Sequence, residues 1–335
     1  MNASLTNQFG IIFKGCGSFV PDQILTNNQI SKRVDTNDNW IKVRTGISNR
    51  RIADIYENVT EMGFNAAEAA IKMANWDVNT IDLIVLASST QNDMFGSAPS
   101  IQAKLGAKNA VAFDLTAACS GFLFALITTS QFLQMGSYKR AIVIGADQNS
   151  SFINWDDRRS CILFGDGAGA VAIEASTSEE NLIGFKLKTD GLRGEFLNLN
   201  YNSQSEKIVD DISYRKVSSS CIDMNGKEVY KFAVREVPLI IEELFQKTNL
   251  QSDDINWLLL HQANQRILDA VGERLKIDNQ KILSNLSNYG NTSAATIPLM
   301  LDEAVRNNKI SSNDIIAISG FGAGLSWGAA LLRWG

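Results

Sequence analysis

The sequence has a single histidine, His261, among its 335 residues. Its four cysteines, Cys16, Cys119, Cys161 and Cys221, are scattered and form neither a C-x-x-C pair nor another metal-ligand spacing. We therefore expect no metal site. Isolated cysteines of this kind are typical of free thiols in a reducing compartment.

Other signals are also missing. Lys and Arg number 31 against 36 Asp and Glu, a net charge of −5, which does not indicate a nucleic-acid or anionic-membrane partner. No apolar run is long enough to span a bilayer. Residues 1–10 are polar and lack both a signal-peptide core and an Arg-rich amphipathic pattern. We expect a cytoplasmic protein, or one of the plastid stroma if an organelle encodes it.

The chain does contain an alternation of apolar strand-like runs and helical patterns. With 45% apolar residues it can bury a core of one large or two ordinary domains. This alternation predicts a layered α/β fold with a largely parallel sheet. The expected strands are 11–13, 81–87, 110–115, 141–144, 170–174, 255–260, 282–286 and 315–318, and the expected helices are 60–74, 122–136, 229–247 and 294–306. Thr60 is the expected N-cap of the first helix.

The second half of the chain repeats the pattern of the first. Residues 81–90 correspond to 255–264, residues 113–136 to 283–307, and residues 141–145 to 315–320. Two copies of one unit place equivalent turns at a pseudo-twofold interface, where a shared site can form. We expect two halves, 1–176 and 177–335. Residues 191–220 read as a long irregular polar loop, either functional or decorative.

Three polar residues on turns are candidates for chemistry. Cys119 lies between a strand and a helix, where free N–H groups and the helix dipole favour a thiolate. The alternative is a small buried residue that fills a tight crossing. Any Cys/His chemistry must use His261, at the carboxyl end of a strand, where ligands gather in α/β sheets. Asn291 lies on the turn that corresponds to that of Cys119.

Four segments resemble the signatures of the β-ketoacyl-[acyl-carrier-protein] synthase III family. They are AACSGF at 117–122, HQAN at 261–264, GNTSA at 290–294 and GFGAGLSWG at 320–328. Residues 39–47 and 164–170 also match, so the resemblance covers essentially the whole chain in order. It implies the thiolase-like fold, with two pseudo-twofold-related α/β halves in α-β-α-β-α layers. The implied activity is the condensation that starts type II fatty acid synthesis.

The resemblance also implies a mechanism without a cofactor. Cys119 would take the acetyl group from acetyl-CoA, and malonyl-acyl-carrier protein would lose CO₂ to give acetoacetyl-acyl-carrier protein. His261 and Asn291 would stabilise the enolate oxygen. The backbone N–H groups of Cys119 and Ala323 would form the other oxyanion hole. The family often has glycine at position 323, so we expect a backbone angle there that alanine tolerates.

The remaining implied contacts involve larger partners. Trp40, Arg44 and Arg158 would bind the CoA nucleotide, for which stacking and cation–π chemistry is suitable. Phe95 would close the acyl pocket of a second subunit in a homodimer; ordinary core packing is its alternative. The surface for the acidic carrier protein would comprise Lys231, Arg266 and Arg274. Glu273 stands where the family can be basic, which weakens or rearranges that surface.

Two alternative functions remain at this point. One is a synthase III-like enzyme of a specialised pathway with another acyl-CoA starter. The other, from a different class, is a non-catalytic acyl- or carrier-binding protein of the same fold. Thiolases fit less well because Gly322-Ala323-Gly324 lacks their second cysteine, and elongating ketosynthases use two histidines. Retention of Cys119, His261 and Asn291 together favours an enzyme.

Overall fold

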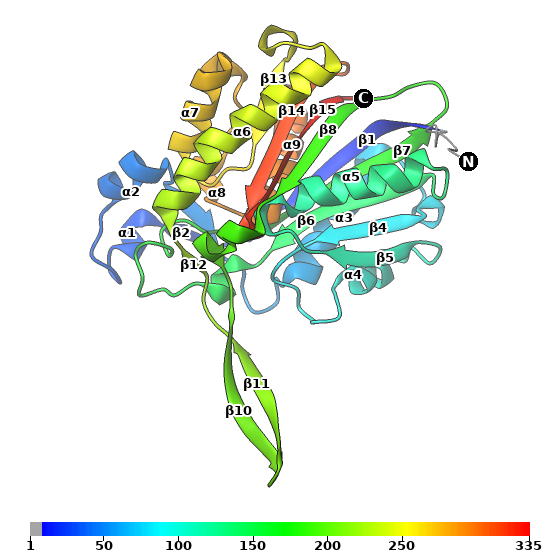
Figure 1. Ribbon diagram of the computed structural model, residues 1–335. Helices are drawn as coiled ribbons and strands as arrows, with labels where there is room; N and C mark the ends of the chain where they lie inside the picture. The colour runs from blue at the N-terminus through cyan, green and yellow to red at the C-terminus, as the bar shows by residue number, and fades with distance from the viewer. Residues whose placement is uncertain (1–8) are drawn as a thin grey trace.

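The computed structural model of the protein describes residues 9–335 (Figure 1). The expectation that the N-terminus carries no targeting signal falls mainly on residues 1–8, outside the described residues. None of the helices in residues 9–335 combines the length and the apolar content that crossing a bilayer requires.

Two mixed β-sheets form the framework, and they follow the same order. The first runs β1-β7-β6-β4-β5 and the second β8-β15-β14-β13. The first has two parallel pairs (β5 with β4, β4 with β6) and the second has one (β13 with β14), and the remaining pairs of both sheets are antiparallel. The expectation of a largely parallel sheet was therefore wrong. The strands are β1 (Gly10–Phe19), β4 (Leu83–Ala87), β5 (Val111–Leu115), β6 (Arg140–Asp147), β7 (Gly167–Ser176), β8 (Leu182–Thr189), β13 (Trp257–Leu260), β14 (Ile315–Gly322) and β15 (Ser326–Arg333).

The helices cover these sheets in five layers, which confirms the predicted α-β-α-β-α arrangement. Helices α3 and α4 pack on the outer face of the first sheet, and α6 and α7 on the outer face of the second. Helices α5 and α9 lie between the sheets and contact both. The helices are α1 (Asn27–Ile30), α2 (Asp38–Thr45), α3 (Val59–Ala74), α4 (Ala98–Leu105), α5 (Gly121–Gln134), α6 (Gly226–Thr248), α7 (Gln265–Leu275), α8 (Leu286–Tyr289) and α9 (Thr296–Arg306).

The sheets divide the described chain cleanly, the first using residues 10–176 and the second residues 182–333. The central helices α5 and α9 come from equivalent places in the two halves, which explains the repeat seen in the sequence. The assignment of 1–176 and 177–335 as separate units stays a prediction.

Three local expectations were wrong. Thr60 lies inside α3, because Asn58 caps that helix by accepting a hydrogen bond from the Glu61 N–H at 3.1 Å. Residues 282–286 form no strand; only an isolated bridge joins Ile282 to Leu258, where the first sheet has its fifth strand. The apolar spacing there reflects burial of Leu283 and Leu286 and not extended structure.

The third wrong expectation is the irregular loop at 191–220. It contains β9 (Leu197–Asn198) and a two-stranded arm, β10 (Tyr201–Val209) paired antiparallel with β11 (Ile212–Ser219). This arm projects from the lower edge of the molecule (Figure 1). All its strand residues except Glu206 are exposed. Short strands β2 (Ile24–Thr26), β3 (Asn49–Arg51) and β12 (Asp223–Met224) complete the fold.

Candidate active site

Cys119 lies on a tight turn that joins β5 to α5. The turn Ala118–Ser120 is a single 3₁₀ turn, closed by a hydrogen bond from the Ser120 N–H to the Ala117 carbonyl at 3.1 Å. Ala118 has a left-handed backbone, with φ of 47°. Ser293 occupies the corresponding place before α9, with φ of 54°. The repeat therefore extends to an unusual backbone conformation at the two turns.

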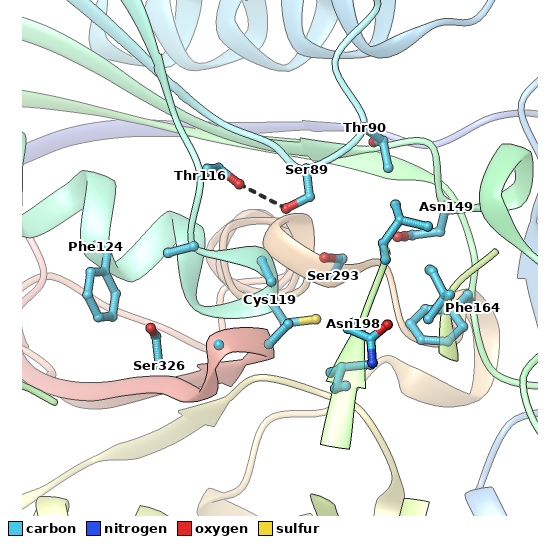
Figure 2. Close-up of a pocket in the computed structure, with 17 residues that line it drawn as sticks. Ser89, Thr90, Thr116, Cys119, Phe124, Asn149, Phe164, Asn198, Ser293 and Ser326 are labelled. Atoms are coloured by element: carbon cyan, nitrogen blue, oxygen red, sulfur yellow. Dashed lines mark hydrogen bonds between the residues drawn. The ribbon is translucent and has the colours of Figure 1, made fainter. Parts of the chain in front are cut away.

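The Cys119 sulfur points into a cavity of about 490 Å³, toward the space between Ser293 and Asn198 (Figure 2). Its walls come from both halves of the chain: Cys119, Ser89 and Phe164 belong to the first half, and Ser293 and Ala323 to the second. Only 7% of the Cys119 surface is exposed. The residue therefore does more than fill a tight crossing, because its thiol faces an open, mainly apolar cavity.

The loop between β14 and β15 approaches the cysteine closely. A Cβ atom on Gly322 would lie 2.7 Å from the Cys119 backbone nitrogen, so only glycine fits there without a shift. Ala323 follows it and lines the cavity. Within this loop only Gly324 has a positive φ, 117°. Alanine at 323 therefore meets no backbone strain, as expected.

His261 directly follows β13 and is held in a fixed orientation. Its backbone N–H donates to the Ser319 carbonyl at 2.8 Å. Its ring Nδ1 lies 2.8 Å from the Thr296 hydroxyl, and Phe321 packs edge-on with ring centres 5.0 Å apart. Burial lowers the pKa of His261 to about 3. The imidazole is therefore neutral near pH 7.

Asn291 is fixed through both its backbone and its side chain. Its N–H donates to the Leu163 carbonyl at 2.9 Å, and its carbonyl accepts from the Gly165 N–H at 3.0 Å. Its side-chain Oδ1 accepts from the Ser293 N–H at 2.9 Å. With Oδ1 occupied, the amide NH₂ group is the part of Asn291 left to donate to another molecule.

His261 and Asn291 do not themselves line the cavity. The segment 291–296 connects them to it, because Ser293 lines the cavity and contacts Asn291, and Thr296 contacts His261. The same segment packs against the Cys119 turn. The three predicted residues thus belong to one contiguous cluster at the junction of the halves.

The sequence-based expectation that Cys119 is a thiolate was wrong, because the pKa of its thiol is raised and not lowered. The pKa of the Cys119 thiol is raised to about 12, chiefly by burial; a hydrogen bond from Ser293 opposes the rise, and the charge of Asp147 adds to it. Loss of hydration therefore outweighs the helix N-terminus here. In the free protein the sulfur is a thiol, and its proton must leave during the reaction.

Sequence reasoning missed Asp147, Ser293 and Thr296. Asp147 ends β6 and is fully buried; it accepts hydrogen bonds from the Ser89 N–H at 2.8 Å and the Ala294 N–H at 3.1 Å. It therefore links the turn after β4 to the turn before α9. Its signal in the sequence was an acidic residue three positions after the apolar run 141–144.

A second hollow, about 350 Å³, holds the residues predicted for a nucleotide. Trp40, Arg44 and Arg158 line it. The guanidinium of Arg44 lies 4.3 Å, and that of Arg158 5.2 Å, from the centre of the Trp40 ring. A third hollow connects this nucleotide hollow to the Cys119 cavity. It shares Asn198 with the Cys119 cavity and Met224 with the nucleotide hollow.

The other predicted contacts lie on the surface. Phe95 is 98% exposed on the turn after β4, which excludes the alternative of core packing. Lys231 pairs with Glu228 at 2.7 Å on α6. Arg266 lies over the Tyr230 ring, and Arg274 lies 4.0 Å from Glu242. These cations occupy the neighbouring helices α6 and α7.

Comparisons with known proteins agree with this geometry. Two family models match, 3-oxoacyl-[acyl-carrier-protein] synthase III over residues 113–191 and its C-terminal model over 245–334. The chain is 71% identical to the β-ketoacyl-[acyl-carrier-protein] synthase III of a Prochlorococcus marinus strain, over 98% of each chain. The 3-oxoacyl-[acyl-carrier-protein] synthase III structure from Aquifex aeolicus is 39% identical with a TM-score of 0.89, over 97% of this chain and 100% of that one.

A priming β-ketosynthase of the R1128 polyketide pathway has the same TM-score, 0.89, at 29% identity, covering 100% of this chain and 99% of the other. The fold alone therefore does not separate starter enzymes of different pathways. The sequence identity does separate them, because the identity to the synthase III relative, 71%, is much higher than the 29% identity to the polyketide enzyme. The alternative of a specialised pathway is not favoured.

Proposed function

Because this chain belongs to the β-ketoacyl-[acyl-carrier-protein] synthase III family, we propose that Cys119, His261 and Asn291 carry out its reaction. The protein is an acyltransferase that catalyses the initiating condensation of fatty acid synthesis. The observation that supports these residues is that the Cys119 sulfur faces a cavity also lined by Ser293, which belongs to the segment that holds Asn291 and contacts His261.

The first half-reaction is a thioester exchange at Cys119. The sulfur forms a bond to the acetyl carbon of acetyl-CoA, the bond to the CoA sulfur breaks, and the thiol proton passes to the departing CoA. The developing oxyanion accepts hydrogen bonds from the backbone N–H groups of Cys119 and Ala323. The Ser293 hydrogen bond and the N-terminus of α5 stabilise negative charge on the sulfur as the proton leaves.

The second half-reaction needs stabilisation of an enolate. Malonyl-acyl-carrier protein loses CO₂, and the electron pair of the broken bond moves onto the thioester oxygen. Neutral His261 and the Asn291 amide donate hydrogen bonds to that oxygen. The enolate carbon then attacks the acyl carbon, and the sulfur of Cys119 is released. No step requires a metal or another cofactor.

The binding of the larger substrates follows the same line of hollows. We assign the CoA nucleotide to Trp40, Arg44 and Arg158, with the pantetheine arm in the hollows that lead to Cys119. Lys231, Arg266 and Arg274 form the surface for the carrier protein. Phe95, exposed as a second subunit would require, supports a homodimer. The cytoplasm, or the plastid stroma for an organelle-encoded copy, is the proposed location.

The roles of the three residues are tested by separating the half-reactions. Cys119→Ser should abolish the acyl-enzyme in intact-mass spectra after incubation with acetyl-CoA, because a serine hydroxyl is a far weaker nucleophile. Cys161→Ser, which changes another buried thiol, is the matched control and should acylate normally. Acyl-enzyme on the Cys119→Ser protein would contradict the nucleophile assignment.

The same assay separates His261 and Asn291 from the cysteine. His261→Ala and Asn291→Ala should lower malonyl decarboxylation by roughly 10²-fold, the usual effect of removing one oxyanion donor, and lower self-acylation much less. Equal losses in both half-reactions would show that these residues do not act on the enolate.

A further inference from the structure

We propose that Thr296 is a positioning residue that keeps the proton of His261 on Nε2, so that the ring can donate to the enolate oxygen. The inference deepens the proposed function, because it rests on His261 acting as a donor. It concerns which of the two imidazole nitrogens carries hydrogen. That choice decides whether a neutral ring donates or accepts at a given atom.

The surroundings of the His261 ring indicate that Thr296 determines which ring nitrogen carries the proton. Its hydroxyl lies 2.8 Å from Nδ1 and is the only hydrogen-bond partner of the ring within residues 9–335. Thr296 is 2% exposed, so water does not readily replace it. Nε2 has no partner among the described residues, which makes it the nitrogen available to a substrate.

Two arrangements of the Thr296 hydroxyl hydrogen are possible. The hydroxyl is also placed to donate a hydrogen bond to the Ser293 carbonyl, at 3.0 Å. If it donates there, Nδ1 must carry the ring proton and Nε2 is left with a lone pair. If it donates to Nδ1, the ring proton lies on Nε2.

The donor role proposed for Nε2 of His261 favours the second arrangement. The Ser293 carbonyl already accepts from the Thr296 backbone N–H, so it does not depend on the hydroxyl. Nδ1 has no other donor within the described chain. Because burial lowers the pKa of His261 to about 3, the ring cannot obtain both N–H groups by protonation near pH 7. A donor at Nε2 therefore requires Thr296 to supply the hydrogen at Nδ1.

The same short segment prepares the second donor. The Ser293 N–H occupies Oδ1 of Asn291, which leaves the amide hydrogens free. Residues 293 and 296 thus act alike, because each engages the acceptor atom of a catalytic side chain and leaves its donor without a partner among the described residues. A direct consequence is that His261, with its proton on Nε2, is not the base that removes the proton of Cys119.

The single histidine makes this test direct. Protein labelled with ¹⁵N-histidine gives the signals of one ring, and their shifts and couplings identify the protonated nitrogen at pH 7. We expect the Nε2–H form in the wild-type protein and in Thr296→Ser. In Thr296→Val, which lacks the donor, we expect the Nδ1–H form to become populated. A wild-type ring protonated on Nδ1 overturns the proposal, whatever the variants do.

The kinetic test uses the two half-reactions. Thr296→Val should lower malonyl decarboxylation by roughly 10- to 10²-fold, spare self-acylation, and be rescued by Thr296→Ser. Thr129→Val is the matched control: Thr129 is a fully buried threonine of α5 whose hydroxyl has no partner among the described residues. It should change neither the ring signals nor the rates.

Two results separate this inference from the proposed function. If Thr296→Val keeps the Nε2–H form and the full decarboxylation rate, Thr296 does not set the ring and the inference is wrong. If His261→Ala keeps full decarboxylation, the donor role of His261 is wrong, and the inference falls with it. Should Thr296→Val fail to fold, the spectrum of the wild-type protein still decides the protonation site.

Discussion

His261 is the clearest case in which burial sets the chemistry of one residue. Its ring is 1% exposed, and the loss of hydration lowers its pKa to about 3, against 6.5 in water. For Cys119 the pKa shifts the other way and rises to about 12, because the charged form of a thiol is the deprotonated one. In both residues burial favours the neutral form, so the resting site holds a thiol and an uncharged imidazole.

The buried imidazole should also make stability depend on pH. Between pH 6.5 and about 3 the unfolded chain binds a proton at His261 that the folded chain does not. The free energy of unfolding therefore decreases progressively as the pH falls through this range. Relative to His261→Gln, the free energy of unfolding should decrease by about 1.4 kcal/mol per pH unit between pH 6 and 4. Denaturant titrations of both proteins measure this. A pH-independent difference would contradict the shifted pKa.

At the scale of elements, the site depends on close approach between turns. The loop after β14 lies against the Cys119 turn because Gly322 has no side chain. Gly322→Ala should therefore move the two oxyanion donors apart and reduce self-acylation, while the secondary structure is retained. Gly191→Ala is the control, since a Cβ there would meet its nearest atom, the Gly324 carbonyl oxygen, at 4.0 Å. Full acylation by Gly322→Ala would argue against tight packing of this loop.

Most elements could be predicted from the sequence because their apolar spacing matched their burial. Strand β4 is entirely buried, and its continuous apolar run predicted it. Residues 282–286 show the limit: Leu283 and Leu286 are buried, but only Ile282, which is partly buried, forms a bridge. Burial and strand pairing are separate properties, and the spacing of apolar residues in the sequence predicts burial only.

The arm was missed for the opposite reason. Strands β10 and β11 have almost no buried residues, so no hydrophobic alternation marks them. In the site, Cys119, His261 and Asn291 carried recognisable motifs. Asp147 and Thr296 did not, because their roles depend on hydrogen bonds between distant segments.

At the scale of the whole molecule, the arm stands out because its strands contribute no buried residue to a core. An isolated two-stranded hairpin is marginally stable in water, and this one pairs only with itself. Brief digestion with trypsin should therefore cut first at Lys207, Arg215 or Lys216, leaving the two sheets intact. Mass spectrometry of the first fragments would identify the site. A first cut within α3 or α6 would show that the body opens more readily than the arm.

The shared central layer has a consequence for how such a protein can be divided. Helix α5 comes from the first half and α9 from the second, yet each packs against both sheets. A gene that encoded one half alone would produce a molecule with an apolar helix face open to water and only part of a reaction centre. The two copies of the repeat must therefore be inherited together, although each is free to diverge in sequence from the other.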